Sequence, residues 1–175
     1  MNSINIPFGL CEITYDDIKL PAMASDGVFS AIPTYKPMFG GALAETQRYI
    51  LESYEVTFTV SIEHQSYETL KMHMQTLKDH QHGLYDDASN VNMEGKRLIV
   101  HPKGTDSKEY DLCILEAYIS PEEGFKRTFK KEKDMFEITF IGKMAKNHVD
   151  GSLINSYFFI GDWEEALSKV GATNG

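Results

Sequence analysis

Two histidines in a polar stretch of the chain are the residues best suited to hold a metal ion. His80 and His82 alternate in the sequence, with Asp79, Asp86 and Asp87 close by. Alternate side chains on a strand share one face and could bind one metal, which would indicate a metal-dependent enzyme. This pair, however, follows an expected helix, and no ligand spacing of a strong metal motif accompanies it. We therefore expect a solvated polar loop and no metal site.

The other residues capable of chemistry do not form a recognisable catalytic motif. The sequence contains no GxSxG, HExxH, P-loop or GxGxxG pattern. Cys113 lies in an apolar strand, where a thiol is usually inert, and Cys11 is the other cysteine; we expect two buried thiols, with a disulfide as the alternative. Glu12, Glu116 and Glu137 could pair as carboxylates, but polar strand faces produce such pairs by chance. We expect no enzyme activity and no cofactor.

Length and charge restrict the kind of protein further. The 175 residues suggest a single domain, residues 1–175, made in the cytoplasm, without a signal peptide or a membrane span. A formal net charge of −9 argues against binding nucleic acid through its phosphates. The same charge suits a protein that nucleic acid passes without sticking, because an acidic surface repels phosphates.

Two strands with one apolar and one polar face dominate the pattern of elements. The first, Arg48–His64, alternates Val56, Phe58, Val60 and Ile62 with polar residues. The second, Met135–Lys143, places Phe136, Ile138 and Phe140 on one face, opposite Glu137 and Thr139. Each strand therefore offers only one face to a core.

Further elements can be placed around these two strands. Tyr67, Leu70, Met74 and Leu77 recur at helical spacing, which predicts a helix over Ser66–His80 with Ser66 as its N-cap. Residues 80–95 are polar and irregular. The other expected strands are Gly9–Tyr15, Ile18–Ala24 at an edge, Gly27–Ile32, Lys96–Pro102, Asp111–Ser120 in the centre and Ser156–Ile160. Asp162 and Glu165 stand at capping-box spacing and open a short C-terminal helix.

Residues 34–46 form an unusually long connection between two of these strands. Pro33 is expected to end the preceding strand, and the connection carries Tyr35, Met38, Phe39 and Leu43, which a solvated loop would normally lack. Gly40-Gly41 would allow it to bend. The fold class is therefore mainly β: a β-sandwich or partly open antiparallel barrel with one flanking helix, a long inter-strand arm and a short C-terminal helix.

Two remaining features have a structural and a functional interpretation. Residues 125–133 contain the one basic cluster, which is either a solvated hairpin or a contact for an acidic face of a second copy. Trp163 is either a binding anchor or, as we favour, the residue that docks the terminal helix onto its own core.

The order of these elements resembles that of the tail tube proteins of tailed bacteriophages, which are related to the inner-tube protein of type VI secretion. The resemblance covers roughly Gly9 to Met144. The arm Thr34–Thr46, the strand-to-helix passage Tyr54–Asp79, the strand Asp111–Ser120 and the segment Phe125–Met144 with its FEITFIGKM ending carry it. It implies subunits that close into rings, hexameric in most of the family, and that stack into a virion tube through which DNA passes without specific binding.

The resemblance also implies two sets of site residues. An interface between subunits or rings would include Tyr35, Lys36, Met38, Phe39, Gly40, Gly41 and Leu43. The lumen would be lined by Glu55, Thr57, Thr59, Glu137 and Thr139. Residues 1–8 would form an N-terminal arm and residues 147–175 a C-terminal extension that serves as a further arm. Other copies, the tape measure, terminator and baseplate proteins would be the partners.

Several alternatives remain open at this point. A terminator, initiator or adaptor protein would make one ring and stop, and a secretion inner tube would conduct proteins. A small-ligand-binding barrel would need a closed monomer with an apolar pocket, which the polar strand faces disfavour. A metal-dependent enzyme would use His80 and His82.

Overall fold

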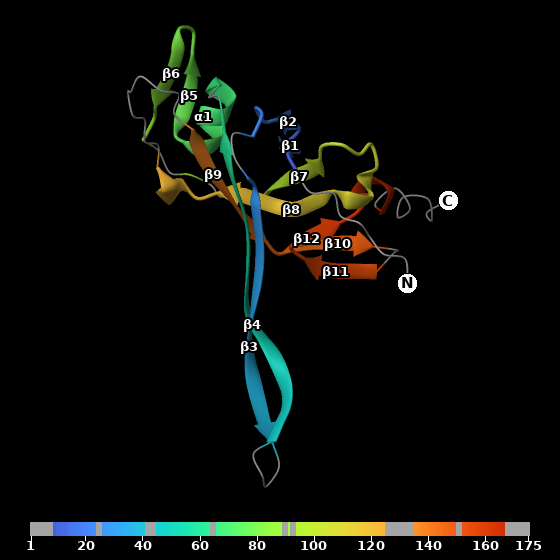
Figure 1. Cartoon of the computed structure of the whole chain (residues 1–175). Coiled ribbons are helices and arrows are strands. Elements are labelled where there is room, and N and C mark those ends of the chain that lie inside the picture. The colour runs from blue at the N-terminus through green and yellow to red at the C-terminus, as the bar shows by residue number, and fades with distance from the viewer. Residues whose placement is uncertain are drawn as a thin grey trace, which may run out of the picture.

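The computed structural model describes residues 9–166, apart from 24–25, 41–44, 64–65, 89–90, 92–93, 125–134 and 150–151. These residues form a β-rich body from which one long hairpin projects (Figure 1). The N-terminal arm 1–8 and the whole basic cluster, residues 125–133, lie outside the described residues. None of the helices in the described part of the chain is both long and apolar enough to cross a membrane.

The body is built on one antiparallel sheet of eight strands. Its strands are β1 (Cys11–Tyr15), β2 (Ile18–Lys19), β3 (Val28–Gly40), β4 (Glu45–Ile62), β7 (Lys96–Pro102), β8 (Leu112–Ile119), β9 (Phe136–Lys143) and β12 (Phe158–Ile160). They are ordered β2-β1-β7-β8-β9-β4-β3. β12 and β9 lie along the same edge of β8: β12 pairs with residues 112–114 and β9 with residues 116–119. The strand that was expected to be central, Asp111–Ser120, is β8 and has neighbours along both edges.

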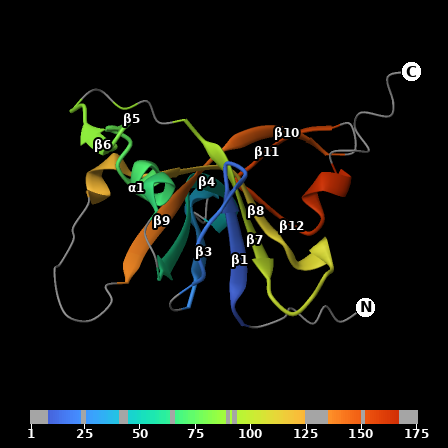
Figure 2. The same ribbon diagram turned by 90° about the horizontal axis from the view of Figure 1, so that it is seen from above.

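Smaller elements lie at the two ends of the body. The hairpins are β5 (Leu77–His80) with β6 (Gly83–Asp86), and β10 (Ala145–Val149) with β11 (Ser152–Ser156); the helices are α1 (Tyr67–His73), the 3₁₀ turns Lys108–Tyr110 and Pro121–Glu123, and a short helix at 163–166. Figure 2 shows α1 and β5–β6 at one end of the body and β10–β12 with the C-terminal helix at the other.

The sheet curls so far that its two ends are bridged by one segment of chain. Leu20, after β2, donates its N–H to the carbonyl of Ile13 in β1, at 2.8 Å. A few residues later, Met23 forms a β-bridge with Ile62 at the end of β4. Because one short segment is bonded to both ends of the sheet, the arrangement is a partly open antiparallel barrel. The mainly-β fold with a C-terminal helix is thus confirmed.

The inside of this barrel is the hydrophobic core. The buried cluster consists of Ile13, Tyr15, Leu20, Met23, Val56, Phe58, Val60, Ile62, Leu98, Val100, Ile114, Ala117, Ile119, Phe136, Ile138 and Phe140. The alternation predicted for residues 56–62 of β4 and 136–140 of β9 is confirmed, because the apolar residues of both segments are buried and the intervening residues are not. Burial raises the pKa of Tyr15 to about 12, so its hydroxyl stays protonated and donates to the carbonyl of Ala117.

The helix predicted over Ser66–His80 is much shorter than expected. Ser66 does cap α1, its side chain accepting from the N–H of Thr69, but the helix ends at His73 and buries Thr69 and His73. The predicted apolar stripe was therefore wrong. The backbone becomes extended at Met74, and the chain continues into the β5–β6 hairpin. The turn of this hairpin ends at Gly83, whose φ of +153° is a conformation that glycine adopts readily.

The C-terminal region is more closely integrated than an arm. In residues 147–175, β10–β11 form a hairpin and β12 joins the main sheet beside β8, with Phe158 opposite Ile114. Asp162 caps the short helix by accepting from the N–H of Glu165 at 2.9 Å, as its spacing predicted. The described part of this segment therefore belongs to its own subunit's fold.

Candidate assembly surfaces

The outer half of the β3–β4 hairpin is a two-stranded ribbon without further support. The two strands pair from Val28 opposite Thr59 to Gly40 opposite Glu45, whereas β9 pairs only with residues 57–62 of β4. Beyond that point the ribbon leaves the body (Figure 1). The expectation of a loop over residues 34–46 was wrong, because strand structure continues to Gly40 and resumes at Glu45.

Pro33 was expected to end the strand, yet β3 runs through both Pro33 and Pro37. β3 is the outermost strand of the sheet. An edge strand tolerates proline because a ring nitrogen facing solvent is not required to donate to a neighbour. The two prolines also blunt this edge against pairing with another strand.

One face of the ribbon continues the core-facing side of the sheet. Cross-strand partners share a face, and Ala31 with Val56 lies on the core side. Following the same side outward, the partners are Pro33 with Tyr54, Tyr35 with Leu51, Pro37 with Tyr49, and Phe39 with Thr46. We call the set Tyr35, Pro37, Phe39, Tyr49 and Leu51 the apolar face of the arm.

A β-bulge keeps this face apolar. Thr34 pairs with Ser53 but Tyr35 pairs with Leu51, so Glu52 is an extra residue in β4. In a regular register Glu52 would stand opposite Tyr35 and place a carboxylate on the apolar face. The bulge instead brings Leu51 to that position.

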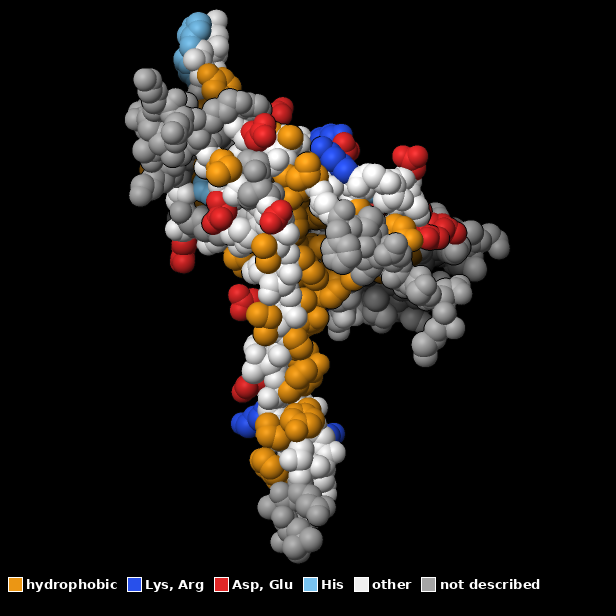
Figure 3. Space-filling model, viewed as in Figure 1, with side chains coloured by type: hydrophobic (Ala, Val, Ile, Leu, Met, Phe, Trp, Pro, Cys, Tyr) orange, Lys and Arg blue, Asp and Glu red, His pale blue; other side chains and the backbone are white. Residues whose placement is uncertain are grey.

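The apolar face is exposed to solvent. Of the fourteen large exposed apolar residues in the described chain, four lie on this face, Tyr35, Phe39, Tyr49 and Leu51, and four lie on the opposite face of the same two strands, Val28, Ile32, Met38 and Ile50. Figure 3 shows hydrophobic side chains following the arm almost to its described end. The opposite face is mixed, with Lys36 opposite Ile50 and Met38 opposite Arg48, whose Nε donates to the Met38 sulfur at 3.2 Å. A two-stranded ribbon of this kind is marginal in water, and its exposed apolar face makes it a candidate interaction surface.

The predicted interface residues are divided by this geometry. Tyr35 and Phe39 lie on the apolar face, whereas Lys36 and Met38 lie on the opposite one. Gly40 is the last paired residue of β3, and Gly41 and Leu43 lie outside the described residues.

Sequence reasoning missed Tyr49 and Leu51, which complete the apolar face. The apolar positions of β4 are even-numbered from Tyr54 onward, and the odd-numbered Tyr49 and Leu51 break that phase. The change of phase was the available signal for the bulge.

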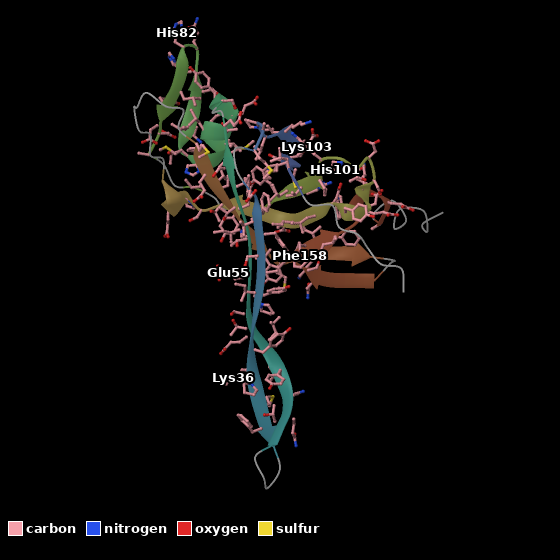
Figure 4. All side chains as sticks on the ribbon, viewed as in Figure 1. Lys36, Glu55, His82, His101, Lys103 and Phe158 are labelled. Carbon is pink, nitrogen blue, oxygen red and sulfur yellow. The ribbon has the colours of Figure 1, made fainter. Side chains whose placement is uncertain are left out.

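The root of the arm is held by aromatic rings from the C-terminal region. Phe29 of β3 meets Phe158 of β12 edge-on with ring centroids 5.0 Å apart, and Tyr54 of β4 lies 5.0 Å from Tyr157. Figure 4 shows Phe158 beside the point where the arm leaves the body. Such pairs stabilise beyond the area that they bury, so β12 anchors the arm.

The five predicted lumen residues share the outer face of β4 and β9, opposite the core. Thr59 and Thr139 are cross-strand partners whose hydroxyl oxygens are 3.1 Å apart, and Glu137 is opposite Ser61. Glu55 and Thr57 continue the same face along β4, and Glu55 and Glu137 are exposed. The structure thus brings all five together on one polar sheet surface.

A pocket of about 340 Å³ lies on the outer face of β1, β7 and β8, under the C-terminal helix. Inside it, His101 Nδ1 is 2.5 Å from an Asp111 carboxylate oxygen, and Nε2 is 3.0 Å from the carbonyl oxygen of Thr105. The hydrogen bond to Asp111 is the main reason why the pKa of His101 is raised. Because both ring nitrogens face acceptors, this arrangement favours the protonated imidazole.

Several other residues of this pocket are buried or in contact with neighbouring elements of the chain. Burial raises the pKa of Cys113 to about 12, so its thiol is not a nucleophile at neutral pH. Lys108 and Glu164 form an ion pair between the 3₁₀ turn and the C-terminal helix. Trp163 lies under the guanidinium of Arg97, whose central carbon is 4.7 Å from the ring centroid, so Trp163 packs against its own subunit.

The other candidates from the sequence do not assemble into a site. His80 and His82 are at the tip of the β5–β6 hairpin (Figure 4), and no three His, Cys, Asp or Glu side chains among the described residues could together hold a metal. Cys11 and Cys113 are both free thiols. Glu116 is opposite Lys143 rather than Glu137.

Comparisons of the chain with protein-family models, with curated proteins and with solved structures found no match.

Proposed function

We propose that this chain is a structural, self-assembling protein: the subunit of a bacteriophage tail tube, in which rings of subunits stack around a lumen that conducts DNA. The observation that carries the proposal is the exposed apolar face of the arm. It continues the core-facing side of the sheet for as far as the arm is described, and nothing in the described part of the subunit covers it.

A neighbouring copy is the partner that best explains this face. Removing a large apolar side chain from water contributes about 1.5–3 kcal/mol, so the four exposed ones on this face, Tyr35, Phe39, Tyr49 and Leu51, can hold a subunit in an assembly. In a ring or tube, the same contact repeats between all copies.

The polar outer face of β4 and β9 is suited to line the lumen. Glu55 and Glu137 are exposed there, and the threonines between them offer no positive charge to phosphates. Repulsion by carboxylates and a net charge of −9 would let DNA slide without binding. The location would be the virion tail, with tape measure, terminator and baseplate proteins as further partners.

The length of the assembly distinguishes this proposal from its nearest alternatives. A terminator, initiator or adaptor would stop at one ring, whereas a tube subunit polymerises. A secretion inner tube would also polymerise, but its lumen would pass proteins. A metal-dependent enzyme would require ligands beyond the two exposed histidines at the β5–β6 tip.

Leu51→Lys and Ile50→Lys provide a matched test. The two residues are adjacent and similarly exposed, at 49% and 44%, but lie on opposite faces of the arm. In sedimentation velocity and negative-stain electron microscopy, we expect the wild type and Ile50→Lys to form rings or tubes and Leu51→Lys to remain monomeric. A wild type that stays monomeric at high concentration would contradict the proposed function. Equal assembly of both variants would contradict the role of the apolar face.

A further inference from the structure

His101 is the centre of a network that fastens several segments to the sheet. It lies in β7 and is the cross-strand partner of Glu12 in β1. Its two ring nitrogens lie within hydrogen-bond distance of Thr105, in the loop after β7, and of Asp111, just before β8. Neither the carbonyl nor the ionised carboxylate can donate, so the neutral ring would lose one of the two bonds.

Asp111 connects this network to the end of β12. Its side chain bonds to His101, while its backbone carbonyl accepts from the N–H of Gly161 at 2.9 Å. At the other end of β12, the carbonyl of Tyr157 accepts from the N–H of Leu115 at 3.1 Å. Asp111 therefore joins His101 to the residue that directly follows β12.

β12 in turn holds the root of the arm. Phe158 and Tyr157 pack against Phe29 and Tyr54, the residues from which the arm extends. A continuous series of contacts thus leads from His101 through Asp111 and β12 to the β3–β4 hairpin.

We propose that His101 is a pH-sensitive clasp: its protonated ring seats Asp111 and β12 beneath the root of the arm, and loss of the proton loosens the arm's attachment. The effect on assembly rests on the proposed function of the arm. The clasp itself does not, because its first readout lies within the subunit.

The sign follows from the charges that surround the ring. The groups facing it are Glu12 from β1, Asp111 before β8, and Asp106, Asp162 and Glu164 around the pocket; the cations nearby are Lys103 and Lys108. Asp111 and, more weakly, Glu12 raise the pKa of His101, against the opposing effect of burial. Both hydrogen bonds of His101 are therefore present below the ordinary histidine pKa. One of them is lost as the pH rises through the higher pKa that His101 has in the folded protein.

The pKa values of Glu12 and Cys113, two other residues of the pocket, are moved away from the neutral range. The ion pair with Lys19 lowers the pKa of Glu12, and burial raises that of Cys113 to about 12. His101 is thus the pocket residue expected to change charge near neutral pH.

The chain supplies its own probe for this transition. Trp163, the one tryptophan in the sequence, lines the same pocket. Fluorescence of the full chain, followed from about pH 5.5 to 9, should change with a midpoint above about 6.5. His101→Gln should abolish this transition, and His82→Gln, which removes a histidine at the exposed β5–β6 tip, should leave it unchanged.

A second variant keeps the test valid if His101→Gln does not fold properly. Asp111→Asn keeps the size of the side chain but removes its charge, so the midpoint should fall toward the ordinary histidine value. A transition that persists in His101→Gln, or a midpoint that does not move in Asp111→Asn, would overturn the clasp.

Hydrogen exchange tests the connection to the arm. After correction for intrinsic rates, amides of residues 157–161 and of the arm root should exchange faster above the transition, by about tenfold for each unit by which the pKa of His101 is raised. His101→Gln should exchange fast at both pH values, and β9 should serve as an unaffected reference. If only the pocket responds, the link to the arm is wrong. If both respond but no polymer forms at any pH, the clasp stands and the proposed function fails.

Discussion

The two halves of the β3–β4 hairpin have the same kind of sequence but opposite surroundings. In the inner half, Val56, Phe58 and Val60 alternate with polar residues and are buried in the barrel. In the outer half, Tyr35, Phe39 and Leu51 occupy the equivalent side and are exposed. The inner half has β9 as a third strand and a core beneath it, whereas the outer half has only its own partner strand.

This difference shows what alternation in a strand does and does not specify. The pattern fixes which side chains share a face, because the period of two is a property of the backbone. It does not specify whether the opposing surface comes from the same subunit or from another. An apolar face that its own subunit leaves uncovered is consistent with an assembly contact.

The largest contrast is expected between two phenylalanines, one in each region. Phe140 is fully buried in the core, and Phe140→Ala should lower the free energy of unfolding by about 3–5 kcal/mol. Phe39 is 63% exposed, and Phe39→Ala should change it by no more than about 0.5 kcal/mol. Urea unfolding of monomeric protein measures both. Similar losses in the two variants would mean that the arm folds back onto the subunit in solution.

The barrel was more predictable from the sequence than the arm. The strands β4, β8 and β9 follow from their apolar patterns, and the Ser66 cap follows from its side chain. The end of α1 at His73 was missed, because the β5–β6 hairpin competes for residues 77–86 through long-range packing that helical spacing does not report. The prediction that Pro33 ends a strand was wrong, because a strand can contain proline when it lies at the edge of a sheet, and the sequence did not indicate that β3 is the edge strand.

Removing the outer part of the arm should separate assembly from folding. A protein lacking Lys36–Ala44 loses the end of β3 from Lys36 onward, but none of the described residues of the buried core. We expect its free energy of unfolding to stay within about 1 kcal/mol of the wild type and its polymerisation to be abolished, as measured by sedimentation velocity. An unchanged oligomer would remove the arm from the assembly mechanism.

The candidate sites were predictable to different degrees. Tyr35 and Phe39 were identified because aromatic residues are unusual in a long connection. The bond between His101 and Asp111 could not be foreseen, because ten residues separate them and only the pairing of β7 with β8 brings them together. Likewise, the aromatic contact between Tyr54 and Tyr157 depends on β12 joining the main sheet.

The smallest effect concerns the polar face of the inner half. Thr59 and Thr139 share a hydroxyl contact across β4 and β9, whereas Thr57, on the same face, is opposite Ile141. A double-mutant cycle of Thr59→Val and Thr139→Val should give a coupling of about 0.2–1 kcal/mol in unfolding, and the control cycle of Thr57→Val with Thr139→Val should give almost none. Both double variants should still assemble, because this face is assigned to the lumen rather than to subunit contacts. Loss of assembly in either one would place a subunit contact on the polar face, and the two halves of the hairpin would no longer differ in the way argued above.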